Sequence, residues 1–207
     1  YEYNPAGQLA TSTTNSGKTF YEYDRAGRLI AVTLPSGDKV SYAIDGEGRR
    51  IGRSVDGKLA ETYVYSDLLR LAAELDANGT LVNRFVYAQS TTTPTYFTKE
   101  GKSYLIVTDD IGTPRLLIDA NAGTMVEKFE FDPWGRIEVA SNSRVVKFGL
   151  AGGLADHDTQ LVHFGVRDYS PVAARWTAPD PVEFGGGDSN LYRYSSDDPI
   201  NRIDPLG

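Results

Sequence analysis

One stretch decides the fold of this chain: Tyr21-Glu22-Tyr23-Asp24-Arg25-Ala26-Gly27-Arg28. A second copy opens the chain at residues 1–7, so that Tyr3 and Tyr23 lie 20 positions apart. Weaker copies of the motif, or its aromatic half alone, follow at residues 42–49, 63–65, 85–87 and 129–136. A short fixed period of this kind indicates a repeat protein, whose units are too small to fold alone.

Each copy of the motif has the pattern of a β-hairpin. Two aromatic side chains separated by one polar residue lie on the same face of a strand. Asp24 is expected to cap a turn by accepting hydrogen bonds from nearby backbone amides, and Gly27 supplies a positive φ at little steric cost. The chain then returns as a second strand through Arg28-Leu29-Ile30-Ala31-Val32. Neighbouring hairpins must stack to bury the aromatic face.

The sequence therefore predicts an all-β protein, an antiparallel array of hairpins that ends in a compact irregular core. We divide it into repeats over residues 1–100, further strands over residues 101–147 and the core over residues 148–207. Helix signals are weak, although residues 67–75 are apolar enough for one short helix. Residues 89–101, rich in Thr, are expected to form a loop between the array and the core.

The composition excludes several kinds of chemistry. With no cysteine, the chain has no thiol nucleophile, disulfide or thiolate metal site. A net charge of −7 disfavours nucleic acid as the main partner, because phosphate binding requires a basic surface. The sequence shows no membrane span and no signal peptide. Since it starts within a repeat and without Met, we expect a fragment whose targeting signal lies elsewhere.

The C-terminal part carries a second, ordered set of motifs. They are Arg167-Asp168-Tyr169-Ser170-Pro171, Arg175-Trp176-Thr177-Ala178-Pro179-Asp180-Pro181, Asn190-Leu191-Tyr192-Arg193-Tyr194, Asp198-Pro199-Ile200-Asn201 and Asp204-Pro205-Leu206-Gly207. This order resembles the C-terminal core signature of RHS (YD-repeat) proteins. Asp109-Asp110-Ile111-Gly112-Thr113-Pro114-Arg115 is similar to the stretch before that core, which Phe148-Gly149-Leu150-Ala151-Gly152-Gly153 then opens.

The resemblance implies both a fold and an activity. In RHS proteins, and in the related C component of insecticidal Tc toxins, a β-shell encloses a variable C-terminal domain that the core cuts loose. The residues tied to this self-cleavage correspond to Arg167, Asp180 and Asp204 here, and the interval of 13 from Arg167 to Asp180 is that of the family. The cleavage motif corresponds to Asp204, Pro205, Leu206 and Gly207. The family motif continues with Leu, whereas this sequence ends at Gly207.

Paired aspartates can hydrolyse a peptide without metal or cofactor, and we expect neither here. When two carboxylates lie close together, one stays protonated and polarises a carbonyl while the other activates water. Arg167 is expected to orient the scissile segment or stabilise an oxyanion. The alternative for Arg167 is a structural ion pair with Asp180 or Asp168.

Other candidate residues are assigned structural roles. An isolated Asp-Pro pair is typical of a turn, and we assign Asp132-Pro133 and Asp198-Pro199 to turns. His157 and His163 lack a metal-binding spacing and are expected in strands or turns. Trp134 and Trp176 are expected to lie in the core or to line the shell, although exposed aromatic rings could also bind sugars.

Two functions from different classes remain open at this point. The first is an encapsulation shell with a single-turnover aspartic autoprotease that releases a C-terminal toxin or effector. Its partners would be that domain, the rest of the shell or a B-component-like protein, and a bacterial secretion system that delivers it outside the cell. The second is a structural or adhesive YD-repeat module that binds carbohydrate or a partner protein at the cell surface, with the terminal motif only plugging the fold.

Overall fold

The computed structural model describes residues 1–88, 92–140 and 145–207 and confirms an antiparallel all-β fold. Its main feature is a 14-stranded sheet in which the order of the strands is their order in the chain. The strands of this sheet are β1 (Glu2–Tyr3), β2 (Leu9–Thr14), β3 (Gly17–Tyr23), β4 (Leu29–Thr33), β5 (Lys39–Ile44), β6 (Arg50–Val55), β7 (Lys58–Tyr65), β8 (Leu71–Asp76), β9 (Leu81–Val86), β10 (Tyr96–Lys99), β11 (Lys102–Thr108), β12 (Pro114–Asp119), β13 (Thr124–Phe131) and β14 (Ile137–Ala140). We call this sheet the wall.

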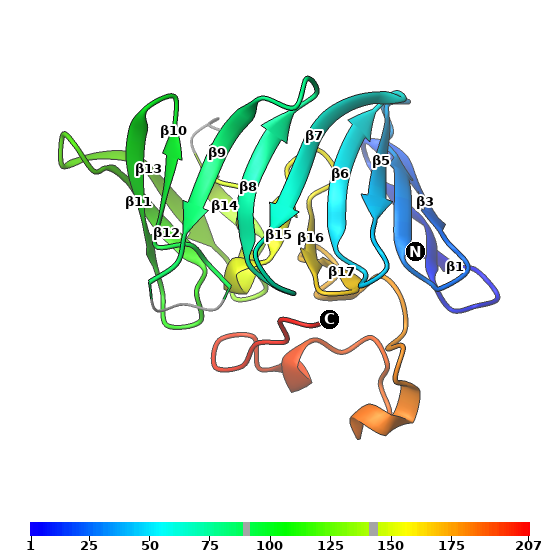
Figure 1. The fold of residues 1–207 in the computed structure, drawn as a ribbon. Coiled ribbons are helices and arrows are strands. Elements are labelled where there is room, and N and C mark those ends of the chain that lie inside the picture. Colours follow the sequence, from blue (N-terminus) through cyan, green and yellow to red (C-terminus); the bar gives the residue numbers. More distant parts are fainter. Residues whose placement is uncertain (89–91, 141–144) are drawn as a thin grey trace.

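The C-terminal part adds a smaller, 4-stranded antiparallel sheet. Its strands are β15 (Leu154–Asp156), β16 (Leu161–Phe164), β17 (Arg167–Ser170) and β18 (Arg175–Trp176). Three short 3₁₀ turns, η1 (Leu150–Gly152), η2 (Glu183–Gly186) and η3 (Ser195–Asp197), lie in the same part of the chain. The expected irregular core therefore contains a small sheet, followed by a C-terminal segment that passes beneath the wall (Figure 1).

The wall curves around the small sheet. Near its first strands, the amide of Leu9 donates a hydrogen bond to the carbonyl of Thr177 at 2.8 Å. Near its last strands, the hydroxyl of Tyr169 donates to the carbonyl of Trp134 at 3.1 Å. Since Tyr169 pairs with Trp176, the neighbour of Thr177, both contacts are made by one small region. A sheet whose two ends meet the same small sheet has to be curved, as Figure 1 shows.

The repeat turns have the predicted local structure. Oδ1 of Asp24 accepts hydrogen bonds from the amides of Ala26 and Arg28 at 2.9 and 3.0 Å, and Gly27 has a φ of +85°. In two of the repeats, the arginine that follows the turn glycine links its turn to the next one. Nη1 of Arg28 donates to the carbonyl of Asp45 at 2.8 Å, and Arg49 repeats this contact with the following turn.

Aromatic side chains of the repeats supply much of the wall's buried face. Tyr63, Phe85 and Phe97 are at most 7% exposed and pack with Phe148 from the C-terminal part. The hydroxyl of Tyr65 donates to the carbonyl of Arg50 at 3.0 Å, so its ring can be buried without losing its polar partner. Neighbouring hairpins are thus joined by side chains as well as by the strand ladder.

Two sequence expectations were wrong in detail. Residues 67–75 form a turn and most of β8 rather than a helix, because Asp67 caps the turn and Leu71 packs into the core between β7 and β9. Residues 89–101 are not only a loop, because β10 lies within them and pairs with β9 and β11. Residues 89–91 of this expected loop lie outside the described residues.

Two adjacent aspartates test the role of the turn carboxylates. Asp109 accepts hydrogen bonds from the amide of Thr113 at 2.8 Å and from Arg115, whereas Asp110 is exposed at the surface. Asp109→Ala should lower the free energy of unfolding in urea by about 1–2 kcal/mol, since it leaves a turn amide unpaired. Asp110→Ala should change it by less than about 0.5 kcal/mol. Equal effects of the two substitutions would contradict this account.

Candidate functional site

The site is centred on β17, where two oppositely charged residues follow one another. Arg167 and Asp168 are 6% and 2% exposed, and as neighbours in a strand they point to opposite faces. Arg167 faces the C-terminal segment and Asp168 faces the wall. Each charge has to be paired where it is buried, since an unpaired charge in the interior is costly.

Arg167 joins the two aspartates that the sequence analysis selected. Its Nη2 atom lies 3.1 Å from Oδ2 of Asp180 and 3.3 Å from Oδ2 of Asp204. Its guanidinium also lies over the ring of Trp176, 4.2 Å from the centroid. Burial lowers the pKa of Arg167, and the charges of the two aspartates oppose that shift.

Local turns hold the other oxygen of each carboxylate. Oδ1 of Asp180 accepts from the amide of Val182 at 2.9 Å, and Oδ1 of Asp204 accepts from the amide of Gly207 at 3.1 Å. The side chains of Asp180 and Asp204 are 25% and 34% exposed, so water reaches both. Among the described residues no hydrogen bond joins the two carboxylates directly. Arg167 connects them instead.

The end of the chain lies against the turn between β16 and β17. The carbonyl of Leu206 accepts a hydrogen bond from the amide of Val166 at 3.0 Å. A Cβ atom on Gly165 would lie 1.8 Å from that carbonyl oxygen, so this close approach requires glycine. The terminal motif is therefore threaded past Arg167.

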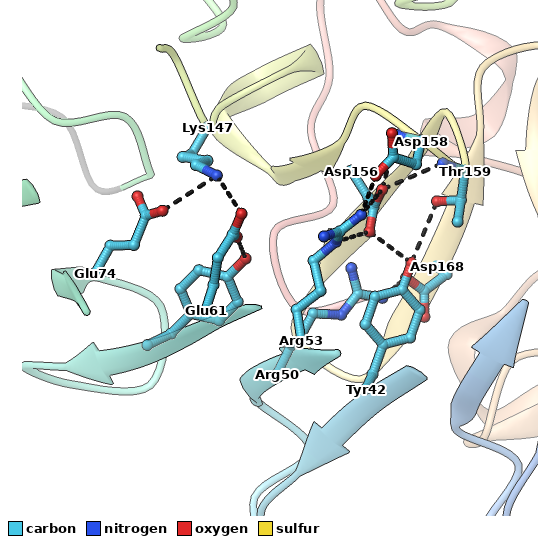
Figure 2. A network of polar contacts seen from close by, with 11 residues as sticks. Tyr42, Arg50, Arg53, Glu61, Glu74, Lys147, Asp156, Asp158, Thr159 and Asp168 are labelled. Atoms are coloured by element: carbon cyan, nitrogen blue, oxygen red, sulfur yellow. Dashed lines mark hydrogen bonds and ion pairs between the residues drawn. The ribbon is translucent and has the colours of Figure 1, made fainter. Parts of the chain in front are cut away.

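On the opposite face of β17, Asp168 pairs with the wall. Nη2 of Arg50 lies 2.6 Å from Oδ1 of Asp168, and both side chains are 1% exposed. The guanidinium of Arg50 stacks on the ring of Tyr42, 3.4 Å from its centroid. Burial alone would raise the pKa of Asp168, but the charge of Arg50 outweighs it and the pKa lies below its ordinary value. Figure 2 shows this pair beside two further groups of ion pairs.

Two further groups of ion pairs, one around Arg53 and one around Lys147, also join the wall to the C-terminal part. Arg53 binds Asp156 at 2.8 Å and also pairs with Asp158. Nζ of Lys147 lies 2.8 Å from Glu61 and 3.1 Å from Glu74. The interface between wall and small sheet therefore contains a layer of paired charges (Figure 2).

Sequence reasoning missed this charged layer, although one signal was present. In β6, Arg50 is 1% exposed while the adjacent Ile51 is 36% exposed. A strand that buries its arginine and exposes its isoleucine reverses the usual pattern, which indicates a charged partner on the buried side. Identifying that partner as Asp168, 118 positions away, requires the fold.

The structure places the remaining candidate residues in supporting roles. Asp132 caps its turn by accepting hydrogen bonds from the amides of Trp134 and Arg136, both at 2.9 Å. Asp198 lies in a turn and accepts a hydrogen bond from the side chain of Asn201 at 2.7 Å. His157 and His163 lie in a turn and in β16. Trp176 is fully buried and belongs to the core of the C-terminal part, while Trp134 is half-buried.

Neither a metal-binding cluster nor a membrane-spanning helix is found in the part of the chain that the structure describes. No three His, Cys, Asp or Glu side chains there are grouped so that they could hold a metal ion. No helix within the same residues has the length and apolar character needed to span a membrane.

The curved wall of repeated hairpins, closed by a small sheet and a threaded tail, defines an RHS or YD-repeat shell domain. The chain belongs to the teneurin YD-shell family, which matches residues 1–200. The tRNA nuclease WapA of Bacillus subtilis strain 168 is 30% identical over 202 residues, which cover 94% of this chain and 9% of WapA. Mouse teneurin-4 is 31% identical over 204 residues, covering 89% of this chain and 7% of the teneurin. The chain thus spans less than a tenth of the length of these relatives.

Solved structures share the fold at low sequence identity. A TcdB2–TccC3 crystal structure superposes with a TM-score of 0.72 at 20% identity, covering 98% of this chain and 11% of the other. The Tc holotoxin pore of Photorhabdus luminescens gives the same TM-score and identity, covering 99% and 10%. These likenesses establish the shell fold.

The ion pair of Asp156 predicts a loss of stability in acid. Burial opposes ionisation of this carboxyl, but hydrogen bonds and charge from Arg53 outweigh it and lower its pKa to about 2. As the pH falls below about 4, the unfolded chain takes up the proton first, so roughly 2 kcal/mol of stability is lost by about pH 2. Urea unfolding across this range should therefore show a flatter pH dependence for Asp156→Asn. The exposed Asp110→Asn is the control, and parallel curves for all three proteins would refute the assignment.

Proposed function

We propose that this chain is part of a bacterial RHS shell that cuts its own polypeptide just beyond Asp204-Pro205-Leu206-Gly207. The cut would release a downstream toxin or effector domain. The observation that supports this function is the single Nη2 atom of Arg167 shared by Asp180 and Asp204, at 3.1 and 3.3 Å. Arg167 and Asp204 are 37 positions apart in the sequence, and the fold brings them together beside the end of the chain.

The chemistry assigned to the two aspartates is acid–base hydrolysis. One carboxylate removes a proton from water as the water oxygen bonds to the carbonyl carbon of the scissile peptide. The other carboxyl group, which enters the reaction protonated, gives its proton to the departing nitrogen as the carbon–nitrogen bond breaks. Arg167 positions both groups and stabilises the negative charge that develops on the carbonyl oxygen.

The bond between the Val166 amide and the Leu206 carbonyl supports the same function. It fixes the peptide just before the proposed cut, which reduces the freedom that the reacting groups must lose. Because the substrate is the same polypeptide, each molecule reacts once. The protein is then an enzyme only in the single-turnover sense.

The proposed partners follow from the wall. Its edge strand β14 and the length of the relatives both suit a larger enclosure, built by the rest of the shell or by a B-component-like protein as in the TcdB2–TccC3 complexes. Such a protein is expected to be secreted or displayed at the bacterial cell surface, delivered by a secretion system. The relatives named as tRNA nucleases suggest a nuclease as one class of released domain.

The function can be tested in the protein extended beyond Gly207 through a following Leu and a reporter domain. Cleavage near residue 207 should occur, and Asp180→Asn and Asp204→Asn should each slow it by at least about 100-fold, since an amide cannot exchange the proton. Intact-mass spectrometry over time measures the rate. The rate should be independent of protein concentration and unchanged by chelators or by serine and thiol reagents.

Asp198→Asn is the matched control, because Asp198 also precedes a proline but lies in a turn away from Arg167. It should cleave at the unmodified rate. If both Asn variants at Asp180 and Asp204 cleave normally, another residue or a contaminating protease is responsible. If the extended protein stays intact in every form, the structural or adhesive module becomes the better assignment.

A further inference from the structure

A groove of about 880 Å³ runs beside the candidate site. One side is formed by three successive repeat turns, at residues 5–8, 25–28 and 46–48. The other side is formed by residues 178–181 and by Phe184 in η2, and Val166 and Arg167 also line the groove. The groove thus separates the turns of the first three repeats from the segment that carries Asp180.

Contacts between wall and core delimit this groove. The hydroxyl of Tyr192 donates to the carbonyl of Gly7 at 2.6 Å. Gly48, with a φ of +89°, approaches Val166 so closely that a Cβ atom would lie 2.6 Å from its Cγ1. The turn glycines of the first and third repeats therefore fix the separation of the two sides.

The C-terminal end of the chain lies next to Arg167, one of the residues that line the groove. Arg167 and Asp180, two of the three candidate catalytic residues, line it directly. Gly207 lies against the same turn, since a Cβ atom on it would be 3.0 Å from the amide nitrogen of Arg167. A residue attached to Gly207 therefore starts beside the groove.

We propose that this groove binds the first residues that follow Gly207, in an extended conformation. The inference rests on the proposed function, in which the polypeptide continues past the cut. In this arrangement the first three repeats bind the substrate, a role that the catalytic residues do not fill. They hold the far side of the scissile bond in register with Asp180 and Asp204, and they retain the new chain end after cleavage.

The chemistry of the groove suits a peptide. Its volume is in the range of ordinary ligand sites, large enough for a short extended segment. Its charged lining is balanced, with positive Arg25, Arg28 and Arg167 and negative Glu47, Asp180 and Glu183. A balanced lining does not favour a polyanion such as nucleic acid, which requires a basic surface.

Phe184 gives the groove an apolar contact. It stands in η2, and 69% of it is exposed. A segment lying in the groove would cover this ring and remove apolar surface from water, which favours binding. The backbone around Phe184 also has an unusual conformation, with Glu183 at a φ of +51° and Gly187 at +78°.

Disulfide trapping tests the proposal, because the chain has no cysteine of its own. The extended protein would carry one cysteine in the groove, Ala26→Cys on the wall side or Pro181→Cys on the other. A second cysteine would be placed in turn at each of about six positions after Gly207, a reach of roughly 20 Å for an extended chain. The bond forms only when the two Cα atoms come within about 7 Å. Mild oxidation and intact-mass spectrometry measure the yield.

Ala122→Cys is the matched control, because Ala122 directly precedes the turn glycine Gly123 as Ala26 precedes Gly27, and both are exposed. Both groove cysteines should give at least about tenfold more crosslink than Ala122→Cys, at neighbouring positions of the segment. Yields no higher than this control would overturn the proposal.

The trapping is carried out in the Asp204→Asn form as well, so that it does not depend on cleavage. A protein that cuts itself but gives no specific crosslink loses the groove assignment and keeps the proposed function. A protein that crosslinks specifically but never cuts keeps the groove assignment and loses the proposed function.

Discussion

Strand β17 has to bury a positive and a negative charge in consecutive positions, and much of the C-terminal architecture satisfies this constraint. Asp168 finds Arg50 of the wall at 2.6 Å, and Arg167, on the opposite face, finds Asp180 and Asp204. Removing one partner of a buried ion pair typically costs about 3–5 kcal/mol, so neither face can be left unpaired. The pair with the wall thereby fixes the strand from which Arg167 reaches the C-terminal segment.

The same constraint explains why the inner side of the wall is not uniformly apolar. Aromatic rings such as Phe85 and Phe97 form the apolar core of the wall. Its charged side chains form ion pairs with the C-terminal part instead: Arg50 with Asp168, Arg53 with Asp156, and both Glu61 and Glu74 with Lys147. Apolar contacts are tolerant of sliding, whereas a buried charge is stable only opposite its partner. The charged layer therefore fixes the position of the small sheet on the wall, and with it the position of Arg167.

The parts that could be predicted from the sequence are those built from local contacts. Asp24 accepts hydrogen bonds from amides two and four residues away, so the turn can be predicted from the repeat sequence alone. The pair Asp180 and Asp204 was selected through a family resemblance, because its link is a third residue on another strand. The partnership of Arg50 with Asp168 spans 118 positions, and no periodicity encodes it. The helix predicted at residues 67–75 was wrong because the leucines of this capped turn have the apolar character of a short helix. Only the neighbouring strands show that the segment continues as β8.

The buried guanidinium of Arg167 holds the C-terminal segment in the site through its ion pair with Asp204. Hydrogen exchange at the amide of Val166, which donates to the carbonyl of Leu206, measures this most directly. In Arg167→Met the exchange of this amide should accelerate by at least about tenfold, because the segment opens locally, while the amides of the wall strands keep their protection. An unchanged rate at Val166 with an intact wall would contradict the claim.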